Sequence, residues 1–224
     1  MDLKQFKKIS IFENMPDKLL REISSKVSTK FLKKDETLFF KGDIGDALYI
    51  IKTGKIKISI PTEEGEELII SIFSDGDFFG ELSLLDKAPR SADAVAITDT
   101  ELLVLRRDVF YTYLFERKQA IEAIISTLCK RLRKTDDFLA DLCYASVPKR
   151  LVKTLIELSE RFGKKFDEKI VLDLEITQSD LGAMLGVTRE TVNRELMKLK
   201  LQGILTKEKK KIIIKDFKKL LDLI

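Results

Sequence analysis

An apolar heptad repeat in the middle of the chain constrains the fold more than any other feature. Spacings of four and three residues alternate over three heptads. The repeat consists of Ile121, Ile125, Leu128, Leu132, Thr135, Leu139 and Leu142. It is typical of a two-stranded coiled coil, so we expect a long helix from about Asp108 to Tyr144 and a homodimer through it. The alternative is one helix packed on its own domain. Thr135, the polar residue of the seam, either sets the register or marks a polar group at the dimer axis.

The residues before this helix follow a different period. Short apolar runs from about residue 27 to residue 105 are separated by glycines, and residues 55–60 alternate between polar and apolar. This pattern favours half-buried strands in a small antiparallel barrel or roll. Five glycines fall where we expect turns with positive φ, namely Gly42, Gly45, Gly54, Gly65 and Gly76.

The part of the chain after the long helix is basic. Residues 146–224 contain 18 lysines and arginines against 12 aspartates and glutamates. This excess favours a polyanionic partner. Pro148 marks an expected hinge near Ser146, because proline ends one helix or begins another.

A helix-turn-helix pattern lies within this basic part, at about Thr177 to Leu199. Thr177 and Asp180 form a capping-box pattern for a first helix, Ala183 is small enough for close helix packing, and Gly186 suits a tight turn. Thr188 is expected to cap a second helix.

The exposed face of that second helix begins with three charged residues, Arg189, Glu190 and Arg194. Arginine pairs with guanine and glutamate accepts from cytosine, so this face predicts base reading in the major groove of double-stranded DNA. The alternative is three solvated charges on an ordinary helix. Residues 203–214, including the basic run 207–211, predict a hairpin wing along the phosphate backbone.

A second candidate site lies between Asp75 and Val95. Residues 80–85 predict a short helix whose backbone N–H groups cradle a phosphate, and Arg90 and Ser91 add phosphate donors. Glu81 would repel an anion, so we expect it to accept from a sugar hydroxyl. Phosphate and sugar together indicate a nucleotide. The alternative is a structural arginine–glutamate pair inside the roll.

The residue types also exclude several functions. The chain contains no histidine and only two cysteines. Histidine-based triads, histidine ligands to zinc or haem, and a four-cysteine iron–sulfur cluster are therefore excluded. We expect no enzyme, no metal, and packing roles for Cys129 and Cys143. The start of the chain, residues 1–16, predicts an amphipathic helix and lacks the features of a signal peptide. No apolar run is long enough for a membrane span, so we expect no membrane partner. Two cysteines are too few for a disulfide framework, which favours a cytoplasmic protein.

In the order of these motifs, the chain resembles the CRP/FNR superfamily of transcription regulators. The resemblance implies an α+β fold, with an N-terminal antiparallel β-roll of the cyclic-nucleotide-binding jelly-roll type, a long dimerisation helix and a C-terminal winged helix-turn-helix. The corresponding domains are residues 1–107, 108–145 and 146–224. The missing histidines and the absence of an N-terminal cysteine cluster argue against the haem and iron–sulfur branches of the family.

The resemblance also implies site residues and partners. The effector ligands would be Gly80, Glu81, Leu82, Ser83, Arg90, Ser91, Arg131, Thr135 and Asp136. The DNA contacts would be Thr177, Ser179, Thr188, Arg189, Glu190, Thr191 and Arg194, on a palindrome of TGTGA-like half-sites. Cyclic AMP is the expected effector, with cyclic GMP as the alternative because Asp136 replaces a family serine. RNA polymerase is an expected partner. The alternatives are a regulator with another or no effector, and a cyclic-nucleotide signalling module without DNA binding.

Overall fold

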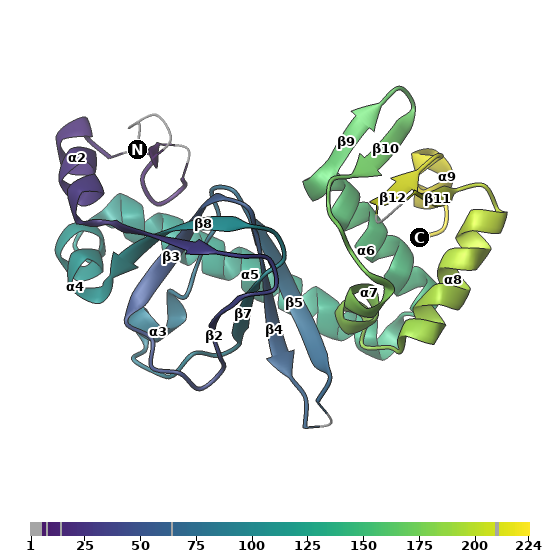
Figure 1. The fold of residues 1–224 in the computed structure, drawn as a ribbon, viewed down its shortest axis with the longest axis horizontal. Coiled ribbons are helices and arrows are strands. Elements are labelled where there is room, and N and C mark those ends of the chain that lie inside the picture. The colour runs from purple at the N-terminus through teal and green to yellow at the C-terminus, as the bar shows by residue number, and fades with distance from the viewer. Residues whose placement is uncertain (1–5, 8, 14, 64, 209–210) are drawn as a thin grey trace. The chain divides into compact units, whose positions relative to one another are not determined.

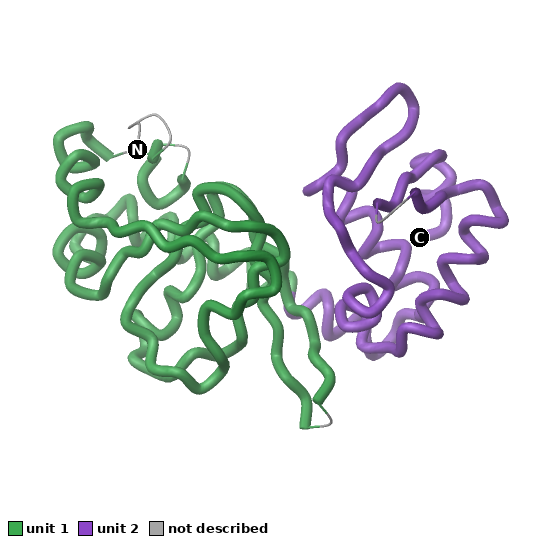
Figure 2. The backbone as a smooth tube through the Cα atoms, viewed as in Figure 1, with its two compact units in different colours: residues 1–134 green, residues 135–224 purple. Residues whose placement is uncertain are grey.

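The computed structural model describes residues 6–7, 9–13, 15–63, 65–208 and 211–224 (Figure 1). The chain divides into two compact units, residues 1–134 and residues 135–224 (Figure 2). The boundary falls within the long helix α5 (Lys118–Tyr144). The α+β class predicted from the sequence is confirmed. The predicted N-terminal amphipathic helix lies partly outside the described residues.

The first unit contains two four-stranded antiparallel sheets. One sheet has the strand order β1 (Ser28–Leu32), β8 (Thr100–Arg106), β3 (Ala47–Thr53) and β6 (Phe78–Phe79). The other has the order β2 (Thr37–Phe39), β7 (Asp93–Ala96), β4 (Lys55–Pro61) and β5 (Glu67–Ser74). Both sheets contribute to one buried cluster, in which Leu32 and Ile51 of the first pack with Ile56 and Phe73 of the second. This arrangement is the predicted antiparallel roll.

Two local expectations for the roll are wrong. Strand β4 does not alternate along its whole length, because its register to β5 shifts between Ile58 and Ser59. Beyond this bulge Ser59 is the buried residue, since a bulge turns the following side chains to the other face. Gly45 is the only one of the five predicted turn glycines whose φ is not positive. It is needed there for space, because a Cβ would lie 2.3 Å from the Cβ of Ser83.

The helical part of the first unit is not one continuous helix. A short helix α4 (Arg107–Phe110) and a π-helix η1 (Tyr111–Phe115) precede α5, and residues 116–117 separate them from it. Val109, Phe110 and Leu114 are buried in a core with helix α2 (Asp17–Lys26). This packing explains why the helix is interrupted before α5. The three apolar residues pack into the core of the first unit, whereas the heptad repeat begins only at Ile121.

Most of the heptad seam is open in a single chain. Ile125, Leu132 and Leu139 are 53%, 62% and 54% exposed, whereas Ile124 faces the core of the first unit. Cys129 and Cys143 are also exposed, so within one chain they are not the packing residues expected from the sequence. None of the helices in the described part of the chain is both long and apolar enough to cross a bilayer.

The second unit is built around helix α6 (Val147–Phe162), which follows the end of α5. The helix-turn-helix consists of α7 (Gln178–Leu185) and α8 (Arg189–Leu201), and the chain ends with α9 (Phe217–Leu221). A four-stranded sheet has the order β11 (Leu205–Glu208), β12 (Lys211–Ile214), β10 (Lys169–Leu172) and β9 (Gly163–Phe166). The predicted hairpin is confirmed as β11 and β12, although residues 209–210 at its tip lie outside the described residues.

Candidate functional site

Arg90 is a buried cation of the expected effector site, at 4% exposure. Its Nη1 donates to the carbonyl of Gly80 and its Nη2 to the carbonyl of Ala47, each at 2.8 Å. The guanidinium also lies over the ring of Phe39, 4.4 Å from its centroid. Burial lowers the pKa of Arg90, opposed chiefly by the nearby Tyr49. Packing therefore fixes this cation before any ligand arrives.

The nearby carboxylates of Asp46 and Glu81 favour this buried charge only at longer range. Among the described residues Arg90 forms no ion pair, and its Nε is buried without a hydrogen-bond partner. A buried cation without a counter-charge is costly, and an anion placed beside it lowers that cost. The site is thus suited chemically to an anion such as a phosphate.

Two glycines make room for Arg90. A Cβ on Gly80 would lie 2.6 Å from its Nη1, and a Cβ on Gly45 would lie 2.9 Å from its Cζ. Gly80 also has a φ of 80°, a conformation that favours glycine. The close approach of these backbones explains why both positions require glycine.

Glu81 is 2% exposed and pairs with α5 rather than with Arg90. Its Oε1 accepts from Arg131 Nη1 at 2.7 Å, and Arg131 also donates to the carbonyl of Phe78. Glu81 therefore does form a structural arginine–glutamate pair, but its partner is Arg131 and not Arg90. The Oε2 of Glu81 is buried and has no partner among the described residues. This oxygen can accept a hydrogen bond from a donor such as a sugar hydroxyl.

The other expected effector residues differ in their placement. Ser83 is buried in the short helix α3 (Leu82–Leu85), whereas Leu82 of the same helix and Ser91 before β7 are exposed. Thr135 and Asp136 lie at exposed positions of α5 and belong to the second unit. Their contact with an effector therefore stays a prediction.

The sequence reasoning missed two residues that position α3. Arg107 Nη2 donates to the carbonyls of Gly45 and Ser83, and its Nη1 donates to that of Leu84. Tyr111 Oη donates to the same Leu84 carbonyl at 2.8 Å. Both residues satisfy carbonyls at the end of a four-residue helix. No sequence signal distinguishes Arg107 from an ordinary surface arginine.

The helix-turn-helix has the predicted local geometry. The Thr177 side chain accepts from Asp180 N while the Asp180 carboxylate accepts from Thr177 N, which completes the capping box. Gly186 ends α7 with a φ of 63°, and the Thr188 hydroxyl accepts from Thr191 N to cap α8. Ser179 is exposed in the first turn of α7. These caps fix where both helices begin.

Close packing at the turn depends on Gly182, not on the neighbouring Ala183 that the sequence pattern favoured. A Cβ on Gly182 would lie 2.6 Å from the carbonyl oxygen of Val187. Gly182 is buried, whereas Ala183 is only partly buried. A glycine inside a helix costs stability relative to alanine, which indicates that the tight approach decides this position.

Arg189, Glu190 and Arg194 are exposed along α8. Arg194 Nε contacts the buried carboxylate of Glu195 at 3.3 Å, and Lys198 Nζ contacts it at 2.9 Å. The bond from Lys198 is the main cause that lowers the pKa of Glu195. Glu195 thus holds the guanidinium of Arg194 through its Nε, while most of that side chain remains exposed to solvent.

Arg150 is a further residue that sequence reasoning missed. From α6 its guanidinium donates to the carbonyl of Leu142 at the end of α5 and to that of Leu185 at the end of α7. Its Nε is buried without a partner among the described residues. A cation placed at two helix C-termini is favourable for both dipoles, so Arg150 joins the last turns of α5 to the helix-turn-helix.

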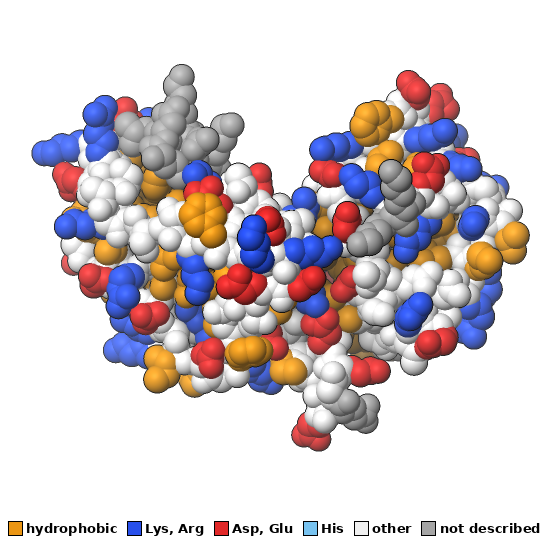
Figure 3. Space-filling view, in the orientation of Figure 1, with side chains coloured by type: hydrophobic (Ala, Val, Ile, Leu, Met, Phe, Trp, Pro, Cys, Tyr) orange, Lys and Arg blue, Asp and Glu red, His pale blue; other side chains and the backbone are white. Residues whose placement is uncertain are grey.

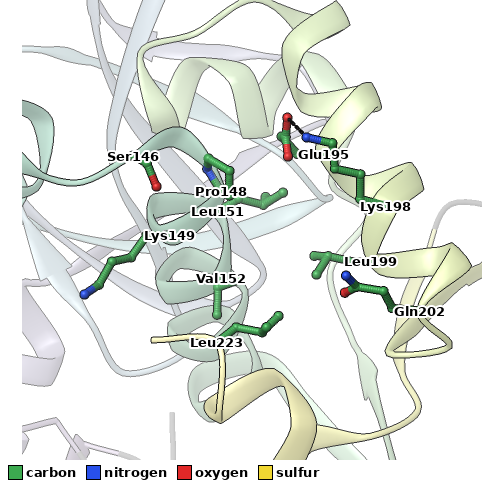
Figure 4. Close-up of a pocket in the computed structure, with 10 residues that line it drawn as sticks. All are labelled: Ser146, Pro148, Lys149, Leu151, Val152, Glu195, Lys198, Leu199, Gln202 and Leu223. Atoms are coloured by element: carbon green, nitrogen blue, oxygen red, sulfur yellow. Dashed lines mark hydrogen bonds and ion pairs between the residues drawn. The ribbon is translucent and has the colours of Figure 1, made fainter.

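A cavity of about 330 Å³ lies between α6 and α8 in the second unit (Figure 4). Apolar side chains such as Val152, Leu199 and Leu223 line it, with Glu195 and Lys198 at its edge (Figure 4). It contains none of the residues expected to bind an effector. Among the residues that the structure places, no cluster of three or more acidic or cysteine side chains is arranged to bind a metal ion.

Basic and acidic side chains are interspersed on the face of the molecule shown in Figure 3. The basic excess of the C-terminal part is therefore not one continuous patch on that face.

The two units match two family models. Residues 29–117 match the cyclic nucleotide-binding domain, and residues 149–223 match the Crp-like helix-turn-helix domain. The chain is 32% identical over 210 residues to a CRP-like cAMP-activated global transcriptional regulator of Mycobacterium tuberculosis, covering 94% of each. The chain belongs to the CRP/FNR family. It is thus a helix-turn-helix transcription regulator with a cyclic nucleotide-binding domain.

Two further proteins are similar to this CRP/FNR regulator. The cyclic AMP receptor protein of Thermus thermophilus is 33% identical over 168 residues, covering 75% of this chain and 74% of its own. The c-di-GMP responsive global regulator CLP of Xanthomonas campestris has a TM-score of 0.77 at 23% identity, covering 89% of this chain and 99% of its own. The second likeness shows the shared fold alone.

Proposed function

We propose that this CRP/FNR regulator is gated by cyclic AMP bound beside Arg90 in the first unit. The observation that carries the proposal is the pair of buried, unsatisfied atoms there, Arg90 Nε and Glu81 Oε2. One requires an acceptor and the other a donor. A cyclic nucleotide supplies both, through its phosphate oxygens and its ribose 2′-hydroxyl.

In this proposal each effector residue has a distinct role. Arg90 and the exposed Ser91 bind the phosphate, and Glu81 accepts from the ribose. Gly80, Leu82 and Ser83 line the pocket, and Thr135 and Asp136 meet the base. Two relatives named for cyclic AMP support adenine as that base. The c-di-GMP responsive neighbour shows that the same fold serves another effector, which makes a different ligand the second candidate.

We propose a homodimer through α5. The exposed seam residues Ile125, Leu132 and Leu139 leave apolar surface in water that a second copy would cover. Spacings of four and three residues suit a parallel pair of helices. The dimer places two α8 helices for two half-sites of a palindrome.

On DNA, the exposed Arg189, Glu190 and Arg194 read base edges in TGTGA-like half-sites. Thr177, Ser179, Thr188 and Thr191 contact the backbone beside them, and the β11–β12 wing follows the phosphates. Because DNA is the partner, we propose a cytoplasmic location and a contact with RNA polymerase at the promoter.

The gating mechanism is a population shift that acts through α5. Glu81 pairs with Arg131 of α5 and also accepts from the effector, so effector binding changes the ion pair that connects the pocket to that helix. Thr135 lies one turn further along α5. Arg150 and the Lys153–Asp141 ion pair join the last turns of α5 to α6, which carries the change past the hinge near Ser146.

Calorimetry with cyclic AMP, cyclic GMP and cyclic di-GMP, combined with DNA binding in the presence and absence of each, tests the proposal. We expect saturable binding of cyclic AMP and a rise in operator affinity. The variant Arg90→Ala loses both effects if the pocket is the sensor. Unchanged DNA binding in that variant indicates a regulator with no working effector site. If Arg189→Ala retains full operator affinity, a signalling module without DNA binding is favoured instead.

A further inference from the structure

One contact of the helix-turn-helix lies on its exposed surface and joins its two helices. The side-chain amide of Gln178 donates from Nε2 to Oδ1 of Asn193 at 2.9 Å. Gln178 is the first residue of α7, between Thr177 and Ser179, and Asn193 lies in the middle of α8. The contact therefore joins the end of α7 that faces the DNA backbone to the base-reading helix.

Asn193 lies on the face of α8 that is proposed to read DNA. It follows Arg189 by four residues, so the two side chains lie on one face of α8, one turn apart. It directly precedes Arg194 and is exposed. The bond from Gln178 places its amide in one orientation before DNA binds, which reduces the entropy lost on binding.

The contact contributes little to the fold of the unit. An exposed hydrogen bond between side chains exchanges with water, so its net worth is small. The packing of α7 on α8 is already determined by the buried Leu181 and Val192 and by the close approach at Gly182. A bond that the fold does not need, on the face that meets DNA, indicates a role in recognition.

We propose that Asn193, oriented by Gln178, is a specificity-determining residue that donates from Nδ2 to an acceptor on a base edge next to those read by Arg189 and Arg194. Its Oδ1 is engaged by Gln178, so the amide faces the groove chiefly as a donor. Guanine, adenine N7 and thymine O4 offer acceptors in the major groove, whereas cytosine offers a donor. Asn193 therefore disfavours cytosine at that position. The inference rests on the proposed DNA-reading function of α8.

Selection of binding sites from randomised duplex DNA, with and without cyclic AMP, tests this role in the full-length chain. The wild type is expected to disfavour cytosine by about fivefold to tenfold at one position of each half-site, the lower end of the discrimination given by a bidentate base contact, because Asn193 donates a single bond. Asn193→Ala accepts all four bases there and keeps the rest of the site. Asn193→Asp presents a carboxylate, which accepts from cytosine N4, and shifts the preference to cytosine. Gln178→Ala weakens the discrimination and leaves overall affinity within about threefold.

Met197→Ala is the matched control, because Met197 is exposed on α8 one turn beyond Asn193. It keeps the wild-type preference at every position, and thermal melting confirms that each variant is folded. If both Asn193 variants select the wild-type site while Arg189→Ala relaxes it, the inference is wrong and the proposed function stands. A wild-type chain that selects no sequence under either condition overturns both.

Discussion

The unpaired oxygen of Glu81 leads to a quantitative test of the effector pocket. Oε1 of this buried carboxylate is taken by Arg131 Nη1 at 2.7 Å, and Oε2 has no partner among the described residues. A ribose 2′-hydroxyl that donates to Oε2 forms a hydrogen bond to a charged group, worth about 1.5–3 kcal/mol. At about 1.4 kcal/mol per tenfold change, cyclic AMP should bind about 10- to 100-fold more tightly than 2′-deoxy cyclic AMP.

The substitution Glu81→Gln separates this bond from the rest of the site. The remaining carbonyl oxygen still accepts from Arg131, but the second position becomes an amide that donates and no longer accepts. The variant should therefore discriminate less than the wild type, because the 2′-hydroxyl can only accept from the new amide, in a neutral hydrogen bond worth about 0.5–1.5 kcal/mol.

Titration calorimetry with the two nucleotides measures both differences. Glu101→Gln is the control, since it removes a carboxylate that pairs with Lys52 at 2.6 Å on the same unit. That variant should keep the wild-type discrimination. If the wild type binds both nucleotides equally, or if Glu81→Gln separates them as strongly as the wild type does, Glu81 Oε2 is not the ribose acceptor and the reasoning fails.

Three further predictions follow from other contacts. Gly182→Ala should lower the free energy of unfolding by about 1–3 kcal/mol in chemical denaturation, because its Cβ meets the Val187 carbonyl oxygen at 2.6 Å; Ala183→Ser, in the same helix, should not. Leu132→Glu should convert dimers to monomers in analytical ultracentrifugation, and a dimeric variant would exclude the α5 seam as the interface. Lys164 and Lys211 lower the pKa of Asp173 from 3.8 to about 2. The ionised Asp173 therefore stabilises the folded chain fully above about pH 3.8, and this stabilisation is lost as the pH falls through about 2. Asp173→Asn should remove this loss of stability in acid, which is at most about 1 kcal/mol because solvent screens the ion pairs. An acid unfolding profile identical to that of the wild type would contradict the prediction.

The local signals in the sequence predicted the elements that depend on near neighbours. The capping box at Thr177, the positive φ of Gly186 and the Thr188 cap are set by residues within one turn, and the structure confirms all three. The β11–β12 hairpin was found in the same way. Such features are readable because the partners of each bond are close together along the chain.

The wrong predictions in the first unit concern features that depend on residues distant along the chain. The bulge at Ser59, the non-turn role of Gly45 and the break before α5 each depend on packing against residues far away in sequence. Periodicity alone predicted an unbroken strand, a turn and an unbroken helix. Where a distant neighbour requires space or a changed register, the local pattern does not record it.

The sequence by itself determined the order of roll, long helix and helix-turn-helix, and the residue types able to bind phosphate, sugar and bases. Tertiary structure decided which of these residues meet. It pairs Glu81 with Arg131 instead of Arg90, and it leaves one oxygen of Glu81 and one nitrogen of Arg90 buried and unsatisfied. It also brings Gln178 to Asn193 across the turn. The physical reason is that hydrogen bonds and burial depend on distance in space, which the spacing of residues along a chain fixes only within a single element.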